Sequence, residues 1–191
     1  MPVKLIATKR FEDARGWFAE TWSQRNFEAA GLDTDFVQDN HSYSRHAGTI
    51  RGVHFQSVPF AQAKLVRCGR GRICNVAVDI RHDSPTFRQW VDAELSAENG
   101  DQLFVLRGFA RGFLIFEPDT EVSYKVDAFY DTASDGGIHW DDPAPAFDLP
   151  LQALAPTLSD KYAGLPSIDI ARFEFSYDGR PLLPLQPPSQ G

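Results

Sequence analysis

The sequence predicts a mainly β fold of the sandwich or jelly-roll type, with helices confined to short segments. Residues 74–80 alternate apolar side chains with Asn75, Ala77 and Asp79, and residues 122–126 repeat this period of two. Strict alternation of this kind is typical of a β-strand. Turn signals follow one another at close spacing through the middle of the chain, which favours many short strands. Together these observations indicate a β-sandwich or barrel.

Glycines and short polar segments mark the turns between the expected strands. Asp13-Ala14-Arg15-Gly16 precedes an aromatic pair, and Gly69 and Gly71 separate residues 64–68 from residues 73–80. Asn99-Gly100 lies between two apolar segments, residues 91–95 and 103–106. Because both central residues of a type I′ turn need a positive φ, Asn-Gly predicts a tight hairpin that joins these two segments.

Only two segments have helical features, and the C-terminus has a composition of its own. Ser23 is a candidate N-cap for a helix over residues 23–30, with Gly31 as its stop, and residues 159–163 are a second candidate. Four prolines fall between residues 180 and 191. We therefore expect a single jelly-roll domain over residues 1–179 and a proline-rich tail, or packed extension, over residues 180–191.

The composition is that of an acidic globular chain of one-domain length. The 191 residues are 42% hydrophobic and 13% aromatic, and 19 basic against 26 acidic side chains give a net charge of −7. No nucleic-acid partner is expected, because binding by phosphate neutralisation normally needs the opposite charge balance. No apolar run approaches the roughly 18 residues of a membrane span, and residues 1–9 lack the apolar run of a signal peptide. With only two cysteines, the expected location is cytoplasmic, with no membrane partner.

Two residues on the expected strands could do chemistry, and each has a structural alternative. Alternation puts Tyr124 on one face with Val122 and Val126, inside the sandwich, where it is either a core tyrosine bonded to a backbone carbonyl or a proton donor. Lys64 shares a face with residues 66 and 68, but the pattern does not decide which face is buried. It is therefore either a solvated lysine on an edge strand or a buried cation with a partner.

His54 lies ten residues before Lys64 in the sequence, among apolar neighbours. It is either a satisfied core or rim histidine or a general base, because histidine accepts a proton near neutral pH. The other four histidines have polar or turn neighbours and are expected at the surface. A histidine, a tyrosine and a lysine that holds an enolate oxygen would suit proton abstraction beside a ketone, and the chain's arginines would suit a diphosphate.

The sequence lacks the signatures of several other kinds of site. It has no His-x-His pair with a further carboxylate and histidine, the set that metal-binding β-barrels usually offer, so no metal is expected. It also has no Gly-x-Ser-x-Gly elbow, no phosphate-binding glycine loop and no dinucleotide fingerprint. Cys68 and Cys74 fall on apolar strands and are expected to be structural rather than reactive.

A series of motifs runs from about residue 11 to residue 161, and their order is as informative as their composition. They are DARG at 13–16, FVQDNHS at 36–42, IRGVHFQ at 50–56, QAKLVR at 62–67, VAVDIR at 76–81, SPTF at 84–87, LSAEN at 95–99, GFA at 108–110, YK at 124–125 and WDDP at 140–143. The series resembles the dTDP-4-dehydrorhamnose 3,5-epimerase family. It is less specific for the reaction, because the group also holds single-site epimerases and enzymes for other nucleotides.

The resemblance implies a cofactor-free jelly roll of the cupin type, commonly a homodimer that exchanges N-terminal strands. The implied substrate is a nucleoside-diphosphate 4-keto-6-deoxyhexose, as in dTDP-rhamnose or other deoxysugar biosynthesis. In the family pattern the base is His54, Lys64 stabilises the C4 enolate, and Tyr124 returns a proton from the opposite face, which inverts the carbon. The implied substrate contacts are Arg15, Phe18, Gln38, Asn40, Arg51, Tyr130 and Lys161.

Two positions depart from the family pattern. Where the family has Gly-Phe-Ala-His-Gly-Phe, residues 108–113 read Gly-Phe-Ala-Arg-Gly-Phe, so Arg111 replaces a histidine of the site and is itself a candidate substrate contact. Where the family has an aspartate that orients the base, in Leu-Ser-x-Lys-Asp, this chain has Tyr162. Loss of that carboxylate should weaken the base, because nothing then fixes its tautomer or stabilises the imidazolium. Arg111 adds a positive charge that either disfavours protonated His54 and Lys64 or stabilises the enolate itself.

These departures leave three functions to separate. The first is epimerisation of a nucleotide-linked 4-keto-6-deoxyhexose, at two carbons by the family default or at one carbon because of the departures. The second is a 3,4-ketoisomerase, which passes through a related enol but moves the ketone. The third is a catalytically impaired nucleotide-sugar-binding barrel, although a pure binder has no need of a base and an acid on opposite sides of a sugar.

Overall fold

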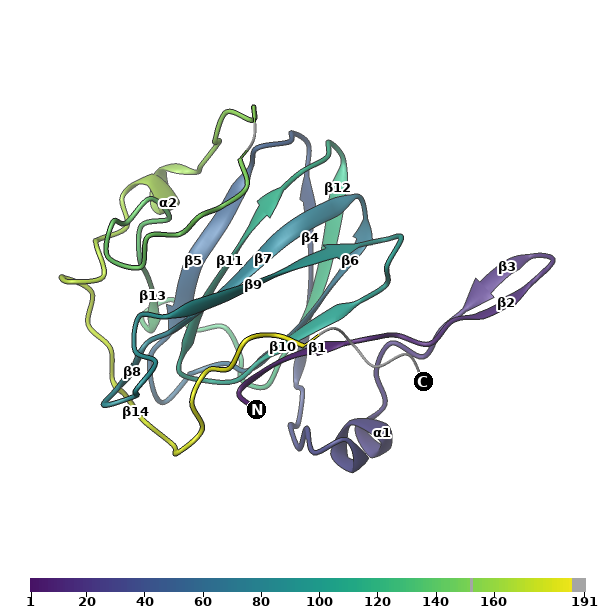
Figure 1. Ribbon diagram of the computed structural model, residues 1–191, viewed down its shortest axis with the longest axis horizontal. Helices are drawn as coiled ribbons and strands as arrows, with labels where there is room; N and C mark the ends of the chain where they lie inside the picture. Colours follow the sequence, from purple (N-terminus) through teal and green to yellow (C-terminus); the bar gives the residue numbers. More distant parts are fainter. Residues whose placement is uncertain (152, 187–191) are drawn as a thin grey trace.

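Two antiparallel five-stranded sheets, packed face to face, form the body of the computed structural model, which describes residues 1–151 and 153–186 (Figure 1). The first sheet has the order β1-β10-β6-β12-β4 and the second has the order β13-β5-β11-β7-β9. The strands of the first sheet are β1 (Val3–Ile6), β10 (Gln102–Val105), β6 (Lys64–Arg70), β12 (Thr120–Val126) and β4 (Gln38–Ser44). Those of the second are β13 (Asp135–Gly137), β5 (Ile50–Gln56), β11 (Phe109–Ile115), β7 (Arg72–Asp79) and β9 (Trp90–Ser96). The predicted jelly-roll-like sandwich is confirmed.

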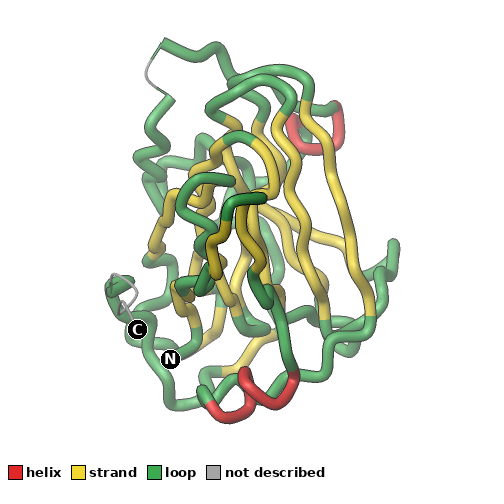
Figure 2. The backbone as a smooth tube through the Cα atoms, turned by 90° about the vertical axis from the view of Figure 1, so that its right-hand side faces the viewer, coloured by secondary structure: helices red, strands yellow, loops and turns green. Residues whose placement is uncertain are grey.

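The smaller elements lie around this sandwich. The hairpin of β2 (Phe11–Asp13) and β3 (Gly16–Phe18) extends away from the sheets (Figure 1). Helices α1 (Gln24–Ala29) and α2 (Asp160–Ala163) lie at opposite ends of the molecule (Figure 2). A short parallel pair joins β8 (Arg81–His82) to β14 (Phe175–Ser176). Both predicted helices are present, and within the described residues neither is long and apolar enough to cross a membrane.

Three hydrophobic clusters explain why so many strands are buried on both faces. Between the sheets, the core consists of Val66, Cys68, Leu103, Val105 and Val122 from the first sheet and Ile73, Ala77, Leu95, Phe113 and Ile115 from the second. The outer face of the second sheet packs against C-terminal residues such as Ile168 and Phe173. The outer face of the first sheet is covered in part by Phe27 of α1, which lies in one cluster with Leu65. A central strand therefore has no solvent-facing side.

The hairpin prediction at Asn99-Gly100 is wrong. The strand before it, β9, pairs with β7 in the second sheet, while the strand after it, β10, pairs with β6 and β1 in the first. The turn itself is well formed, because Asn99 Oδ1 accepts hydrogen bonds from the backbone N–H of Ser96 and of Asp101, and Gly100 has a φ of +66°. The Asn-Gly pair thus correctly predicted a turn, but this turn connects strands of different sheets instead of two hairpin partners. Gly71, with a φ of +79°, makes the predicted turn between β6 and β7, which also lie in different sheets.

The segment after residue 179 has no strand or helix as far as residue 186, and it packs on the sandwich. Leu182 is buried in the core between the sheets, and its backbone N–H donates to Thr86 Oγ1 over 2.9 Å. The remainder of the predicted tail, residues 187–191, lies outside the described part of the chain.

Candidate active site

His54 faces the space between the two sheets. Its neighbours along β5, Val53 and Phe55, both pack in the cluster on the outer face of the second sheet, so the imidazole projects from the other face. Arg111 of β11 is its cross-strand partner on one side, and Gly137 of β13 is its partner on the other. The histidine is therefore held on a central strand of a rigid sheet.

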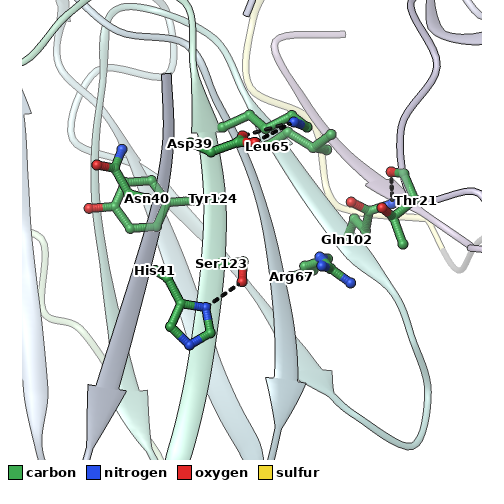
Figure 3. A pocket seen from close by; sticks show the side chains of 10 residues that line it. Thr21, Asp39, Asn40, His41, Leu65, Arg67, Gln102, Ser123 and Tyr124 are labelled. Carbon is green, nitrogen blue, oxygen red and sulfur yellow. Dashed lines mark hydrogen bonds and ion pairs between the residues drawn. The ribbon is translucent and has the colours of Figure 1, made fainter. Parts of the chain in front are cut away.

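Tyr124 and Lys64 approach the same space from the first sheet. Tyr124 is paired with Asn40 of β4 and with Val66 of β6, and Figure 3 shows the Asn40 and Tyr124 side chains next to each other. Lys64 is only 5% exposed. Its Nζ lies 3.2 Å from His54 Nε2 and 6.0 Å from the centre of the Tyr124 ring. The alternative of a solvated edge lysine is wrong, because Lys64 lies between the histidine and the tyrosine.

These three side chains line one pocket of about 350 Å³. That volume falls within the range of small-molecule sites. The histidine comes from the second sheet and the tyrosine from the first, so the two reach the pocket from opposite walls. The other residues of the lining are Gln38, Asn40, Gln56, Gln62, Tyr130, Asp135, Lys161 and Tyr162.

One carboxylate organises the part of the pocket next to α2. Asp135 has a side chain that is 6% exposed; it pairs with Lys161 and accepts a hydrogen bond of 2.9 Å from the hydroxyl of Tyr130. Burial lowers the pKa of Lys161, but the hydrogen bond that Lys161 donates to Asp135, together with the charge of that carboxylate, outweighs this effect and the pKa is raised overall. Lys161 is therefore a permanent cation at neutral pH, well suited to an anionic ligand.

Burial and neighbouring cations depress the pKa values of the base candidate and of the lysine. The pKa of His54 is well below its ordinary value, first because of burial and then because of the positive charges of Lys64, Arg111 and Lys161. Burial, followed by the charge of Arg111, lowers the pKa of Lys64 to about 7. At neutral pH the histidine is thus uncharged and ready to accept a proton, while the lysine is near the midpoint of its titration.

The two departures from the family pattern lie directly against His54. Arg111 is 1% exposed and donates through Nε to Asn75 Oδ1 over 3.1 Å, while its Nη2 has no hydrogen-bond partner among the described residues. Burial lowers the pKa of Arg111 to about 10. Tyr162 stacks on the imidazole, with ring centres 5.9 Å apart and an interplanar angle of 26°. His54 Nδ1 is buried and has no described hydrogen-bond partner.

Some residues predicted for the site do not line this pocket. Arg15 pairs with Asp13 at the tip of the β2–β3 hairpin, and Phe18 is 69% exposed on the same hairpin. The Arg51 guanidinium donates instead to Ser44 Oγ and to the backbone oxygen of Tyr43. Arg111 is buried and is not among the residues that line the pocket.

Three residues of the lining were not predicted from the sequence. Gln56 and Gln62 each belong to a quoted motif, which was the available signal; they donate to backbone oxygens of the loop after β12. Asp135 gave no signal, because a Ser-Asp-Gly-Gly segment is typical of a turn. It enters the pocket only because β13 pairs with β5.

A second pocket, also of about 350 Å³, includes outward-facing residues of the first sheet (Figure 3). Its polar groups satisfy one another: His41 contacts Ser123 over 2.8 Å, and Lys125 pairs with Asp39 over 2.8 Å. It lacks both His54 and Lys64. The pocket between the sheets is therefore the candidate active site.

A jelly-roll pocket that holds a neutral histidine, a lysine and a tyrosine, with further cations nearby, is suited to acid–base chemistry on a small anionic substrate. Comparisons with known proteins agree. The family model described as dTDP-4-dehydrorhamnose 3,5-epimerase matches residues 2–169. A protein of that name from Sinorhizobium fredii is 48% identical over 175 residues, which cover 92% of this chain and 89% of that protein.

Solved structures give the same result. The epimerase of Bacillus anthracis with TDP and PPi bound has a TM-score of 0.84 and 47% identity, over 86% of this chain and 93% of that one. The Legionella pneumophila enzyme in complex with dTDP-4-keto-L-rhamnose has a TM-score of 0.86 and 39% identity, over 90% of each chain. This chain belongs to the dTDP-4-dehydrorhamnose 3,5-epimerase family, which consists of carbohydrate epimerases of the isomerase class.

Proposed function

We propose that this protein is a 3,5-epimerase of dTDP-4-keto-6-deoxyglucose in dTDP-rhamnose biosynthesis. The observation that carries the proposal is the position of a base and an acid on opposite walls of one pocket, with Lys64 between them. Inversion of a carbon requires removal of a proton from one face and its return to the other. A ketone at C4 acidifies the hydrogens on both C3 and C5, so one set of residues serves both carbons.

The first half of the reaction generates an enolate. His54 Nε2 takes the proton, the C–H bond breaks, and its electron pair moves onto the C4 oxygen. Lys64 exchanges its contact with Nε2 for one with that oxygen, where its positive charge stabilises the developing negative charge. In this step the depressed pKa of His54 matters, because the ring must be neutral to act as the base.

The second half inverts the carbon. The Tyr124 hydroxyl delivers its proton to the face opposite His54, the new C–H bond forms, and the carbonyl at C4 is restored. Tyr124 then regains a proton from solvent and His54 releases the one that it took. Repetition at the second carbon completes the double epimerisation.

We further propose roles for the surrounding residues. Lys161, held by Asp135, binds the diphosphate, while Gln38, Asn40 and Tyr130 contact the sugar and its nucleotide. Arg15 and Phe18 belong to a hairpin that projects from its own chain, which supports a homodimer in which the hairpin of one chain completes the pocket of the other. Arg51 remains a predicted contact. The pathway is cytoplasmic in this proposal, and residues 1–179 form the catalytic domain.

Two substitutions test the mechanism with dTDP-4-keto-6-deoxyglucose in heavy water. His54→Ala removes the base, and we expect loss of both deuterium incorporation and epimerisation, by roughly 10²–10⁴-fold. Tyr124→Phe leaves the base in place, so we expect deuterium exchange with little inversion. Undiminished exchange in His54→Ala, or unchanged inversion in Tyr124→Phe, would rule out these assignments.

A further inference from the structure

His54 has an unusual environment for a general base. In the described part of the chain, no side chain accepts a hydrogen bond from its Nδ1, which is buried. Its Nε2 lies 3.2 Å from Lys64 Nζ. A charged lysine can only donate, so Nε2 accepts and the ring proton of neutral His54 sits on Nδ1. No hydrogen bond to a carboxylate therefore fixes this tautomer, and none stabilises the ring once it is protonated.

Three of the six titratable groups that face His54 from the neighbouring elements are cations. The six are Lys64 from β6, Arg111 from β11, Lys161 and Tyr162 from α2, Tyr124 from β12 and Asp135 from β13. The one carboxylate among them, Asp135, is engaged by Lys161 and Tyr130. Protonated His54 would thus meet three cations, only one of which is paired with that carboxylate.

Arg111 is the member of this set whose charge has the least compensation. It is 1% exposed, its hydrogen-bonding partner Asn75 is a neutral amide, and its Nη2 lacks a partner among the described residues. It is opposite His54 in the register of β5 and β11, so its charge acts on the ring at short range. Its guanidinium carbon lies 5.0 Å from the centre of the Phe113 ring and 5.7 Å from the centre of the Tyr124 ring, so aromatic faces, and no carboxylate, offset its charge. A buried cation without a carboxylate partner is costly to a fold, so the presence of Arg111 here calls for a reason beyond packing.

Tyr162 orients the His54 ring by stacking instead of by a hydrogen bond. Its ring stacks on the imidazole at 26° and 5.9 Å, which fixes the plane of His54 without hydrogen bonding to it. Asp160, at the start of α2, does not line the pocket. The helix thus contributes an aromatic surface at the position from which a carboxylate would raise the basicity of the ring.

We propose that His54 works as a base without a carboxylate partner: Arg111 keeps its ring uncharged and Tyr162 holds its plane, which makes both of them positioning residues of the epimerisation. This inference rests on the proposed function for its catalytic meaning, but the charge state of His54 can be measured without substrate. The direction of the pKa of His54, lowered by burial and by Lys64, Arg111 and Lys161, supports it.

Histidine NMR titration tests the proposal directly, with His54→Gln used to assign the His54 signal among the five histidines. In the unsubstituted protein we expect His54 to stay neutral to a pH well below about 6.5, the ordinary midpoint of a histidine. Arg111→Met removes the charge and keeps the bulk, and we expect the His54 midpoint to rise by about one pH unit. A merely structural arginine would lower stability without moving that midpoint.

Tyr162 lies at the edge of the pocket, so its substitutions test the proposal even if Arg111→Met does not fold. Tyr162→Asp puts a carboxylate beside the ring, and we expect the His54 midpoint to rise by about 1–3 pH units. Tyr162→Phe keeps the stacked ring and is the matched control, with an expected midpoint equal to that of the unsubstituted protein. An ordinary His54 midpoint in the unsubstituted protein, or no rise in Tyr162→Asp, would overturn the inference.

Deuterium exchange into the substrate, measured against pH in the same variants, separates this inference from the proposed function. We expect the acid limb of the exchange rate to move upward in pH together with the NMR midpoint. If the NMR shifts occur but no variant exchanges deuterium, the proposed function fails and the account of His54 stands. If exchange occurs with an ordinary His54 midpoint, the function stands and the inference fails.

Discussion

At the scale of single residues, the candidate site contains a buried lysine whose charged form lowers the stability of the fold. Lys64 is buried, and its nearest polar partner is a histidine rather than a carboxylate. Burial lowers its pKa to about 7 from an ordinary value of 10.5, which means that the fold penalises its charged form. The proposed role of Lys64, a cation that approaches an enolate oxygen, gives a reason for this cost.

Replacement of this lysine separates its two effects. We expect Lys64→Met to lose most epimerase activity and yet to raise the free energy of unfolding at pH 6 by about 1–3 kcal/mol, because a buried cation is removed. The sign follows from linkage: the unsubstituted protein gains stability as the pH rises from about 7 towards 10.5, where the unfolded lysine still binds a proton and the folded one does not. Urea denaturation from pH 6 upward measures both the gain in the free energy of unfolding of Lys64→Met and the rise in stability of the unsubstituted protein with pH. A less stable Lys64→Met at pH 6 would contradict this account.

The pH dependence of catalysis follows from the same two groups. In the proposed mechanism His54 must be neutral and Lys64 must be charged, so kcat/KM should fall on the acid side as His54 becomes protonated and on the alkaline side from about pH 7 as Lys64 loses its proton. Because the bound diphosphate favours the charged lysine, the alkaline limb of kcat should lie at higher pH than that of kcat/KM. Steady-state rates at saturating and limiting substrate distinguish the two limbs. A kcat/KM that is flat up to pH 9 would refute the role of Lys64.

At the scale of elements, β5 shows how a strand backbone positions the base. Gly52 has a φ of +106°, a conformation that residues with a Cβ rarely adopt. A Cβ there would lie 2.6 Å from the backbone oxygen of Arg111, 2.8 Å from Gly112 Cα and 3.0 Å from His54 Nδ1. The glycine therefore allows β5 and β11 to approach each other closely next to the His54 side chain.

Gly52→Ala tests this close approach. We expect a loss of about 1–3 kcal/mol in the free energy of unfolding, from backbone strain and the backbone contacts together. We also expect a lower kcat with a smaller change in KM, because His54 is displaced more than the substrate contacts. Thermal denaturation and steady-state kinetics give both quantities.

The control for this substitution is Gly179→Ala, at a glycine with a φ of +82° and no atom within 4 Å of the added Cβ. It should reproduce the strain without the change in kcat. Equal kinetic effects of the two substitutions would mean that Gly52 has no special relation to the base.

The same elements mark how far sequence reasoning reaches. Period-two alternation correctly placed Tyr124 inside the sandwich, and the Ser23 and Gly31 signals located α1, because these features depend on neighbours in the sequence, although the Ser23 side chain makes no capping hydrogen bond. Neither alternation nor turn signals identify the partner of a strand. The Asn99-Gly100 hairpin was therefore wrong, because β9 and β10 pair in different sheets. Asp135 was not predicted, because only the pairing of β13 with β5 brings it to the pocket. Even the juxtaposition of Arg111 with His54, two residues singled out from the sequence, follows only from the register of β11 on β5.

At the scale of the whole molecule, the proposed base and the proposed acid come from different sheets. The projecting hairpin carries part of the proposed ligand contacts away from the pocket of its own chain. Arg15 lies on the β2–β3 hairpin, whereas His54 lies in the sandwich (Figure 1). If a second copy provides the hairpin, each site contains residues from two chains.

Mixed dimers test this arrangement. We expect Arg15→Ala and His54→Ala each to be poorly active alone. After joint refolding, random mixing gives hybrid dimers in which one of the two sites has both intact residues, so about a quarter of the unsubstituted activity should return. A mixture of two separately refolded samples is the control. No recovery in hybrids whose formation is verified by mass spectrometry would contradict a shared site.

The most direct test of the central claim is a deuterium count on the sugar. The protein is incubated with dTDP-4-keto-6-deoxyglucose in heavy water, and the product is followed by mass spectrometry and NMR. The account predicts two deuterons, at C3 and C5, both with inverted configuration. A single deuteron would identify a single-site epimerase, and a ketone moved to C3 would identify a ketoisomerase. No incorporation, together with tight binding of the nucleotide sugar, would contradict the claim that this pocket catalyses epimerisation.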